Sequence, residues 1–120
     1  MKNLIINLLD ELNKQFGDDD TIFYGHETMK YYKIMTRKKK QFLDEGEIYC
    51  FIAKRDFINK TLGYVRQGDI LKPRTCEEPH KHARGKLSNR NSWKCFGRYG
   101  VAHRTTKGEL CEPHKGALTV

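Results

Sequence analysis

The feature that most constrains the fold is the spacing of apolar residues in the first seventeen positions of the chain. Six of them recur at the intervals of one helix face, namely Leu4, Ile5, Leu8, Leu9, Leu12 and Phe16. Asn3 is suited to cap the first turn, and Gly17 is suited to end the helix. The pattern therefore predicts an amphipathic helix over residues 3–16, within a helical segment 1–17. We expect this helix to cover one face of a sheet rather than to bind a partner protein.

The residues that follow predict the sheet, over residues 29–73. Three segments have the residue content of strands, namely 29–36, 47–54 and 62–72. The first also has a spacing compatible with a second helix, but its aromatic and β-branched residues favour a strand. In the third, Gly68 and Asp69 predict a tight turn between two paired strands, and Pro73 ends the pairing. A helix on an antiparallel sheet of about three to five strands is an α+β fold.

A chain of 120 residues has the size of one small domain, which excludes a multidomain enzyme. The N-terminal apolar run, Leu4-Ile5-Ile6, is too short for a membrane span, and the small-residue cleavage site of a secretory signal does not follow it. We therefore expect a cytoplasmic protein with no membrane partner. The four cysteines are widely spaced, which indicates reduced thiols or metal ligands rather than a disulfide framework.

The charge balance favours an anionic partner. Lys and Arg number 23 against 15 Asp and Glu, a formal net charge of +8. Residues 1–20 hold five of the acidic residues, whereas residues 81–107 hold eight Lys or Arg and no Asp or Glu. A basic surface of this kind typically binds nucleic acid or another phosphate-bearing ligand. We therefore place the partner-facing surface in the basic, Cys- and His-containing segment 76–120.

The first candidate site is the run from position 79 to position 86. In an extended conformation four basic side chains would lie on one face, because side chains alternate along a strand. They are His80, His82, Arg84 and Lys86. Arg grips phosphate oxygens through two N–H groups, so we expect Arg84 to bind phosphate first, with His82 and Lys86 beside it. The alternative is a solvated basic loop in which Gly85 serves only a turn.

Downstream, aromatic and cationic residues are interleaved, a composition typical of proteins that stack on bases while neutralising phosphates. The expected phosphate contacts are Arg90, Lys94 and Arg98, and the expected stacking rings are Trp93 and Tyr99. Trp93 is equally suited to the core, because the chain has few other apolar residues after position 71.

Two Cys-to-His pairs raise a second hypothesis, a zinc site. The pairs are Cys76 with His80 and Cys111 with His114. Two pairs at such short spacing can complete a tetrahedral zinc site. Cys95 and His103 lie between them and are further candidate ligands. The expected cofactor is therefore either none or one zinc ion.

With zinc present, His82 and either Asn89 or Asn91 are compatible with a His-Asn-His nuclease, in which a histidine activates water against a phosphodiester. The sequence contains no Gly-rich nucleotide loop, no nucleophile elbow and no paired carboxylates at helical spacing. We therefore assign no catalytic residues and expect a protein that is not an enzyme.

Five short motifs occur in order along the chain: Tyr32-Lys33, Cys50-Phe51-Ile52, Gly68-Asp69-Ile70-Leu71-Lys72, Lys81-His82-Ala83-Arg84-Gly85 and Gly97-Arg98-Tyr99-Gly100. Together they resemble a family of small, mostly uncharacterised tailed-phage proteins. The resemblance covers residues 30–104 and implies a phage origin without supplying a reaction. Cys76 stands where the family usually has Trp, and Leu87-Ser88-Asn89 replaces a more apolar and acidic run, so the resemblance does not imply the zinc site.

We therefore expect a phage-encoded, non-enzymatic protein of the host cytoplasm that binds a phosphate-rich ligand, nucleic acid first, in host takeover or counter-defence. Three alternatives stay open: the sequestering of a nucleotide second messenger, the inhibition of a host or defence enzyme, and a zinc-containing nuclease. A host or defence protein as partner and an oligomeric state are both compatible with the sequence.

Overall fold

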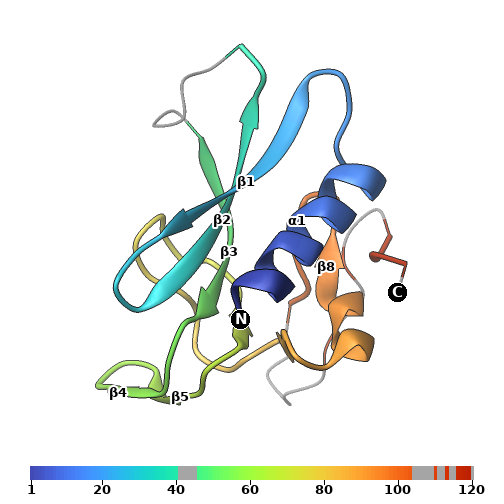
Figure 1. Ribbon diagram of the computed structural model, residues 1–120. Coiled ribbons are helices and arrows are strands. Elements are labelled where there is room, and N and C mark those ends of the chain that lie inside the picture. Colours follow the sequence, from blue (N-terminus) through green and yellow to red (C-terminus); the bar gives the residue numbers. More distant parts are fainter. Residues whose placement is uncertain (41–45, 104–109, 111–112, 114–115, 120) are drawn as a thin grey trace.

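Helix α1, Lys2–Gln15, packs its apolar stripe against one face of a five-stranded sheet (Figure 1). The structure, a computed structural model, describes residues 1–40, 46–103, 110, 113 and 116–119. The predicted α+β architecture is confirmed, and so is the place of the first helix on the sheet. Within the described ranges, no helix is long and apolar enough to span a bilayer.

The strands follow in chain order. The first seven are β1 Thr21–Glu27, β2 Tyr31–Lys38, β3 Glu47–Ala53, β4 Phe57–Asn59, β5 Gly63–Val65, β6 Asp69–Leu71 and β7 Gly85–Lys86. A short 3-10 helix, η2 Arg90–Cys95, then leads into β8 Phe96–Gly97 and β9 Gly100–Val101. The main sheet has the order β1-β2-β3-β6-β7 with antiparallel neighbours, whereas β4–β5 and β8–β9 form two separate hairpins.

The two ends of α1 differ in how well the sequence predicts them. Met1 is the N-cap, so the capping role predicted for Asn3 is wrong and that residue lies inside the first turn. At the other end, the Gly17 N–H donates to the carbonyls of Leu12 and Asn13, both at 3.1 Å. A side chain at Gly17 would collide with the Asn13 carbonyl. Glycine is therefore required where the chain leaves the helix, as predicted.

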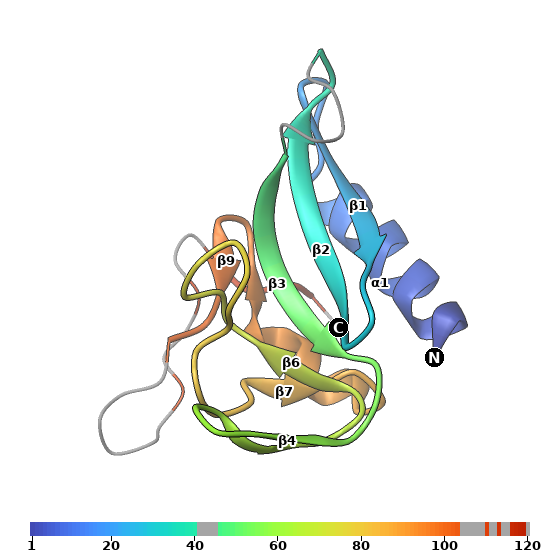
Figure 2. The same ribbon diagram turned by 90° about the vertical axis from the view of Figure 1, so that its left-hand side faces the viewer.

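Two apolar clusters hold the sheet, one on each face. The larger lies between α1 and the sheet and includes Leu8, Leu12, Phe23, Ile34, Ile52, Trp93 and Phe96. The smaller lies on the opposite face, beneath the β4–β5 hairpin, and consists of Tyr31, Phe51, Ala53, Leu62, Val65 and Leu71. Burial of a large apolar side chain stabilises a fold by about 1.5–3 kcal/mol. The hairpin is short, so it covers only one end of its face of the sheet (Figure 2).

The strand pairing predicted within residues 62–72 is wrong. β5 pairs with β4, and β6 pairs with β3 and β7. Gly68, at φ +86°, does form a turn, in which the Asp69 N–H donates to the Arg66 carbonyl (3.0 Å). The Gly68 N–H, however, donates to the Ala53 carbonyl at the end of β3 (2.9 Å). This bond directs β6 onto the main sheet instead of back along β5.

β1 is an edge strand of the main sheet, and α1 covers part of its free edge. The Asn13 amide nitrogen donates to the Phe23 carbonyl (3.0 Å), and the Phe23 N–H donates to the Asn13 amide oxygen (2.8 Å). Unpaired edge groups are a template for pairing with another chain. Asn13 therefore attaches the helix to the sheet and blocks the edge at Phe23.

Asn13→Ala should lower the free energy of unfolding by about 1–3 kcal/mol, because two main-chain groups of β1 lose their partner. Asn7→Ala, on the exposed side of α1, is the matched control and should be neutral or slightly stabilising, since alanine has the higher helix propensity. Urea denaturation measures both changes. Equal effects of the two substitutions would contradict the bracing role of Asn13.

Candidate nucleic-acid interface

The row of basic side chains predicted over residues 79–86 does not form. Pro79 bridges to Pro73, the chain then bends at Lys81 and His82, and only Gly85–Lys86 belongs to a strand. His82 has φ 71°, in the left-handed region, which breaks the alternation of an extended chain. The prediction that His80, His82, Arg84 and Lys86 share one face is therefore wrong.

Arg84, the first expected phosphate ligand, is 7% exposed. Its Nε donates to the Ala102 carbonyl (3.2 Å), and its Nη1 donates to the carbonyls of Lys81 (2.9 Å) and His82. These bonds close the bend around the left-handed residue and fasten it to the segment after β9. Arg84 thus acts as a main-chain clamp, which corrects its predicted place on an open phosphate-binding edge.

Two further expected phosphate ligands face the protein's own carboxylates. Lys86 pairs with Asp69 (3.1 Å), and Arg90 lies 3.9 Å from Glu11. The Arg90 guanidinium also stacks 4.1 Å above the Trp93 ring. Both cations therefore already have anionic partners inside the fold.

Trp93 is completely buried, so its predicted role as a stacking ring is wrong. Its Nε1–H donates to the Leu87 carbonyl (2.9 Å), and its ring meets Phe96 edge-on, with centroids 6.4 Å apart. A ring in this position completes the apolar cluster beneath α1. The scarcity of apolar residues after position 71 explains why the core takes it.

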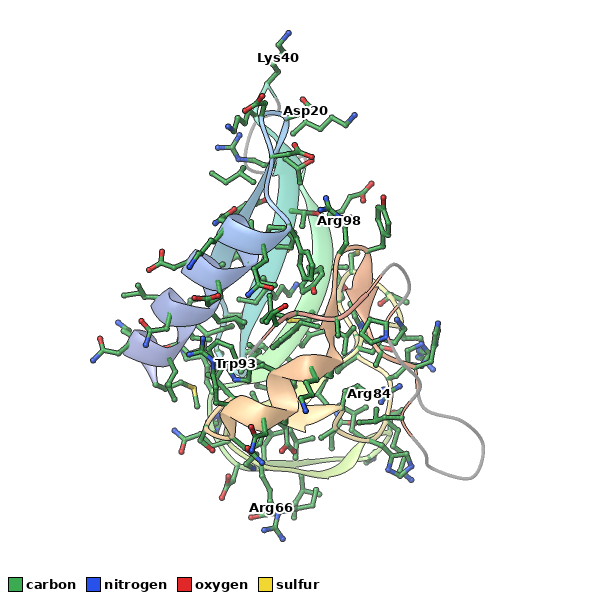
Figure 3. The ribbon with its side chains drawn as sticks, turned by 90° about the vertical axis from the view of Figure 1, so that its right-hand side faces the viewer. Asp20, Lys40, Arg66, Arg84, Trp93 and Arg98 are labelled. Carbon is green, nitrogen blue, oxygen red and sulfur yellow. The ribbon has the colours of Figure 1, made fainter. Side chains whose placement is uncertain are left out.

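The remaining expected contacts lie on the α1 side of the sheet. Lys94 is exposed on η2, and Tyr99 is 69% exposed in the β8–β9 turn. The Arg98 guanidinium lies 5.7 Å from the Phe16 ring and contributes to lowering the pKa of Asp18, after two main-chain hydrogen bonds to that carboxylate. Figure 3 shows Arg84 beside η2, whereas Arg98 lies nearer the end of the molecule marked by Asp20. The expected cations therefore do not form one contiguous surface.

Of the four predicted zinc ligands, the structure describes Cys76 and His80. Cys76 is exposed in the loop after β6, and His80 is half-buried. Burial, and then the charges of Arg84, Lys72, Arg74 and His103, lower the pKa of His80. Cys111 and His114 lie outside the described residues. In the described part of the chain, no three His, Cys, Asp or Glu side chains are close enough to hold a metal ion.

A different surface combines rings and cations, on the sheet face opposite α1. Strand alternation turns Phe23 and Ile34 toward the helix, so their neighbours face the other side. The exposed part of this face, here called the platform, consists of Ile22, Tyr24, His26, Lys33, Met35, Arg37 and Ile48. The platform side of β1, β2 and β3 faces the viewer in Figure 2, beyond the part that the β4–β5 hairpin covers.

Cations on the platform lie along aromatic rings. The Arg37 guanidinium is 5.8 Å from the centre of the Tyr24 ring, and the Lys33 ammonium is 5.6 Å from that of Phe51. A cation over a ring is attracted by the negative ring face and adds about 0.5–1 kcal/mol when exposed. The platform thus offers one partly exposed ring, Tyr24, with a cation beside it, whereas the Phe51 ring beneath Lys33 is buried.

Gly46 sets the position of the Tyr24 ring. A side chain at Gly46 would overlap the Tyr24 hydroxyl and crowd the Thr36 carbonyl. The Tyr24 side chain therefore extends from β1 across β2 to the start of β3. Its ring spans the platform instead of projecting from the sheet edge.

The charges on the platform are of one sign. The seven side chains include Lys33, Arg37 and His26 and no carboxylate. Exposed Lys39 and Lys40 follow at the end of β2, and Lys38 pairs loosely with Asp20 (3.5 Å). The platform itself therefore attracts anions, whereas Asp18, Asp19 and Asp20 lie beside the lysines at the end of β2.

Sequence reasoning missed the platform because it did not predict β1 and assigned no function to the strand at 29–36. A usable signal is the period-two placement of polar and cationic residues, at Tyr24 and His26 in one segment and at Lys33 and Arg37 in the next. Pairing the two segments in antiparallel register would have placed these side chains on one face.

Comparison of the chain with protein-family models, with curated proteins and with solved structures finds no match. A function for the platform is therefore inferred from its side chains alone.

Arg84→Met should lower the free energy of unfolding by about 2–4 kcal/mol, because three carbonyl groups lose a charged donor. Arg66→Met, at an exposed position directly after β5, should change the free energy of unfolding by about 0.5 kcal/mol or less. Urea denaturation compares the two. A stable Arg84→Met variant would mean that the guanidinium is not a clamp.

Proposed function

We propose that this protein binds single-stranded nucleic acid through the platform. The observation that carries the proposal is an open strand face on which the partly exposed Tyr24 ring lies among basic side chains and on which no carboxylate stands. Binding of this kind needs no catalytic group, in keeping with a protein that is not an enzyme.

The chemistry of the platform suits unpaired bases better than a duplex. A base has two flat apolar faces that become available only when it leaves the stack of a double helix. An aromatic ring on a sheet can take up such a base, with about 1–3 kcal/mol gained for each. A twisted sheet face does not enter a duplex groove as a helix does.

Each platform residue has a specific role in this proposal. Tyr24 stacks on one base, and the Arg37 guanidinium beside it contacts that base or its phosphate. Lys33 neutralises a second phosphate, while Met35 and Ile22 supply apolar contact. Lys39 and Lys40 extend the path of the strand beyond the sheet.

The biological setting of the proposal comes from the sequence motifs. Their resemblance to tailed-phage proteins supports a phage-encoded protein that acts in the host cytoplasm, in host takeover or counter-defence. Tight binding of a free nucleotide with weak binding of long strands would instead favour the sequestering of a second messenger. Stable co-purification with one host protein would favour the inhibitor.

Tyr24→Ala should weaken binding of a fluorescent single strand of about 12 nucleotides by roughly 5- to 150-fold, because a stacking ring is lost. Fluorescence anisotropy measures the affinity, and circular dichroism checks the fold. Tyr64→Ala is the matched control, since Tyr64 also has an arginine beside its ring (Arg66, 5.2 Å) but lies on the β4–β5 hairpin. The proposal fails if both substitutions weaken binding equally.

Binding should also weaken with rising salt, because each neutralised phosphate releases counterions. The log–log slope changes by about 0.7 per phosphate on a single strand, so Arg37→Met should make the slope shallower by about that amount. Lys60→Met, at an exposed position outside the platform, should leave the slope unchanged. An affinity that does not respond to salt excludes nucleic acid as the ligand.

Zinc bound by Cys76, His80, Cys111 and His114 is a separate proposal, based on residue spacing alone. Elemental analysis of the dialysed protein should then find close to one zinc per chain, and Cys76→Ser should reduce that content. Protein that folds and binds nucleic acid without zinc would remove both the metal site and the zinc-nuclease alternative.

A further inference from the structure

A second group of basic side chains lies beside the platform, where the chain returns from the loop after β6. The bridge between Pro73 and Pro79 places Lys72 next to His80, and the His80 N–H donates to the Lys72 carbonyl (2.7 Å). Paired residues of antiparallel strands direct their side chains to the same face. The Lys72 ammonium and the His80 imidazole therefore stand on one side of this small ladder.

The segment after β9 brings a third basic group to the same place. The Lys72 ammonium donates to the Val101 carbonyl (2.6 Å), and Arg84 Nε donates to the carbonyl of the next residue, Ala102 (3.2 Å). The residue after that is His103, whose side chain is exposed. Lys72 and Arg84 thus bind the carbonyls of two consecutive residues, and this places His103, the next residue, close to Lys72 and His80.

Basic groups surround His80, and the ion pair found nearby joins Glu78 to Arg74. The charged groups that act on His80 are Arg84, Lys72, Arg74 and His103, all of them basic. Burial lowers the pKa of Lys72, and the Arg84 charge lowers it further. In the described part of the chain, the one acid paired nearby is Glu78, which holds Arg74 (2.7 Å), and none is paired with Lys72, His80 or His103.

We infer that Lys72, His80 and His103 form a binding site for a phosphate group, separate from the platform. A bound anion relieves the repulsion among these groups and accepts hydrogen bonds from an ammonium and from two imidazole N–H groups. Lys72 and Arg84 would repel a metal cation at this point, so the phosphate site and the zinc proposal, which also uses His80, exclude each other.

The position of the site connects it with the platform. The Lys33 ammonium, on the platform, donates to the Cys76 carbonyl in the same loop (3.1 Å). The loop therefore touches the platform, whereas the Lys72 side chain points to the α1 side of the sheet, where its ammonium meets Val101. The phosphate belongs either to the end of a bound strand or to a free mononucleotide, and the chemistry of recognition is the same for both.

The direct test uses inorganic phosphate and so does not depend on nucleic-acid binding. In a two-dimensional NMR titration, phosphate should shift the imidazole signals of His80 and His103 with a dissociation constant of about 1 mM or tighter. His26 belongs to the platform, which also attracts anions, so the shifts of His80 and His103 should saturate at a lower phosphate concentration than any shift of His26. Absence of any His80 or His103 shift, or equal shifts at His26, overturns the proposed site.

Substitutions show whether the named groups bind the anion. His103→Ala should weaken phosphate binding by at least about threefold and Lys72→Met by about tenfold or more, whereas Lys60→Met should have no effect. Lys72 also donates to a main-chain carbonyl, so thermal melting is needed to show that the Lys72→Met variant is folded. His103 is exposed, so a loss of phosphate affinity in His103→Ala does not result from unfolding. Unchanged phosphate affinity in His103→Ala and in folded Lys72→Met would overturn the site.

Two further measurements are needed. One identifies the molecule that carries the phosphate, and the other distinguishes failure of the phosphate site from failure of the platform. A 5′- or 3′-phosphorylated strand that binds more tightly than its unphosphorylated form identifies a strand end, whereas a mononucleotide that binds as tightly as the strand identifies the free nucleotide. Tyr24→Ala should leave binding of inorganic phosphate intact. Intact phosphate binding in Tyr24→Ala would show that the phosphate site does not depend on strand binding, so each proposal can fail without the other.

Discussion

The packing of α1 against one face of the sheet is the constraint on which the rest of the structure depends. It commits Phe23, Ile34 and Ile52 to the larger apolar cluster, and strand alternation then sends their neighbours to the opposite face. Only the β4–β5 hairpin covers that second face, at one end. The platform is therefore a consequence of how the core is built. A register slip of one residue would bury Lys33 and expose the apolar stripe.

Basic residues serve two different purposes in this protein, and their environment decides which. Arg84 is buried and donates to three main-chain carbonyls, so it stabilises the bend at His82, whose φ lies in the left-handed region. Lys33 and Arg37 are partly exposed and lie along the Phe51 and Tyr24 rings, where their charge can also meet an external anion. Net charge alone indicates an anionic partner as a hypothesis, but it does not distinguish a cation that holds the main chain from one that contacts a ligand.

The sequence predicts the parts of the fold that depend on local pattern. Helix α1, the strands near 31–38 and 47–53, and the exit at Gly17 follow from periodicity and from the conformational freedom of glycine. The partner of β6 does not, because the bond from Gly68 to Ala53 joins segments separated by a whole hairpin. For Trp93 the sequence leaves a stacking ring and a core residue equally open, because which apolar residue fills the space beneath α1 depends on all the others. The structure places Trp93 in the core.

By itself, the sequence determined an α+β domain, an excess of positive charge and the place of the first helix on a sheet. Only the tertiary structure decided where that charge is accessible, which is on the strand face opposite the helix and beside the loop after β6, and not as one row along residues 79–86. The physical reason is that periodicity is a property of neighbouring residues, whereas exposure and charge pairing depend on contacts between residues far apart in the chain.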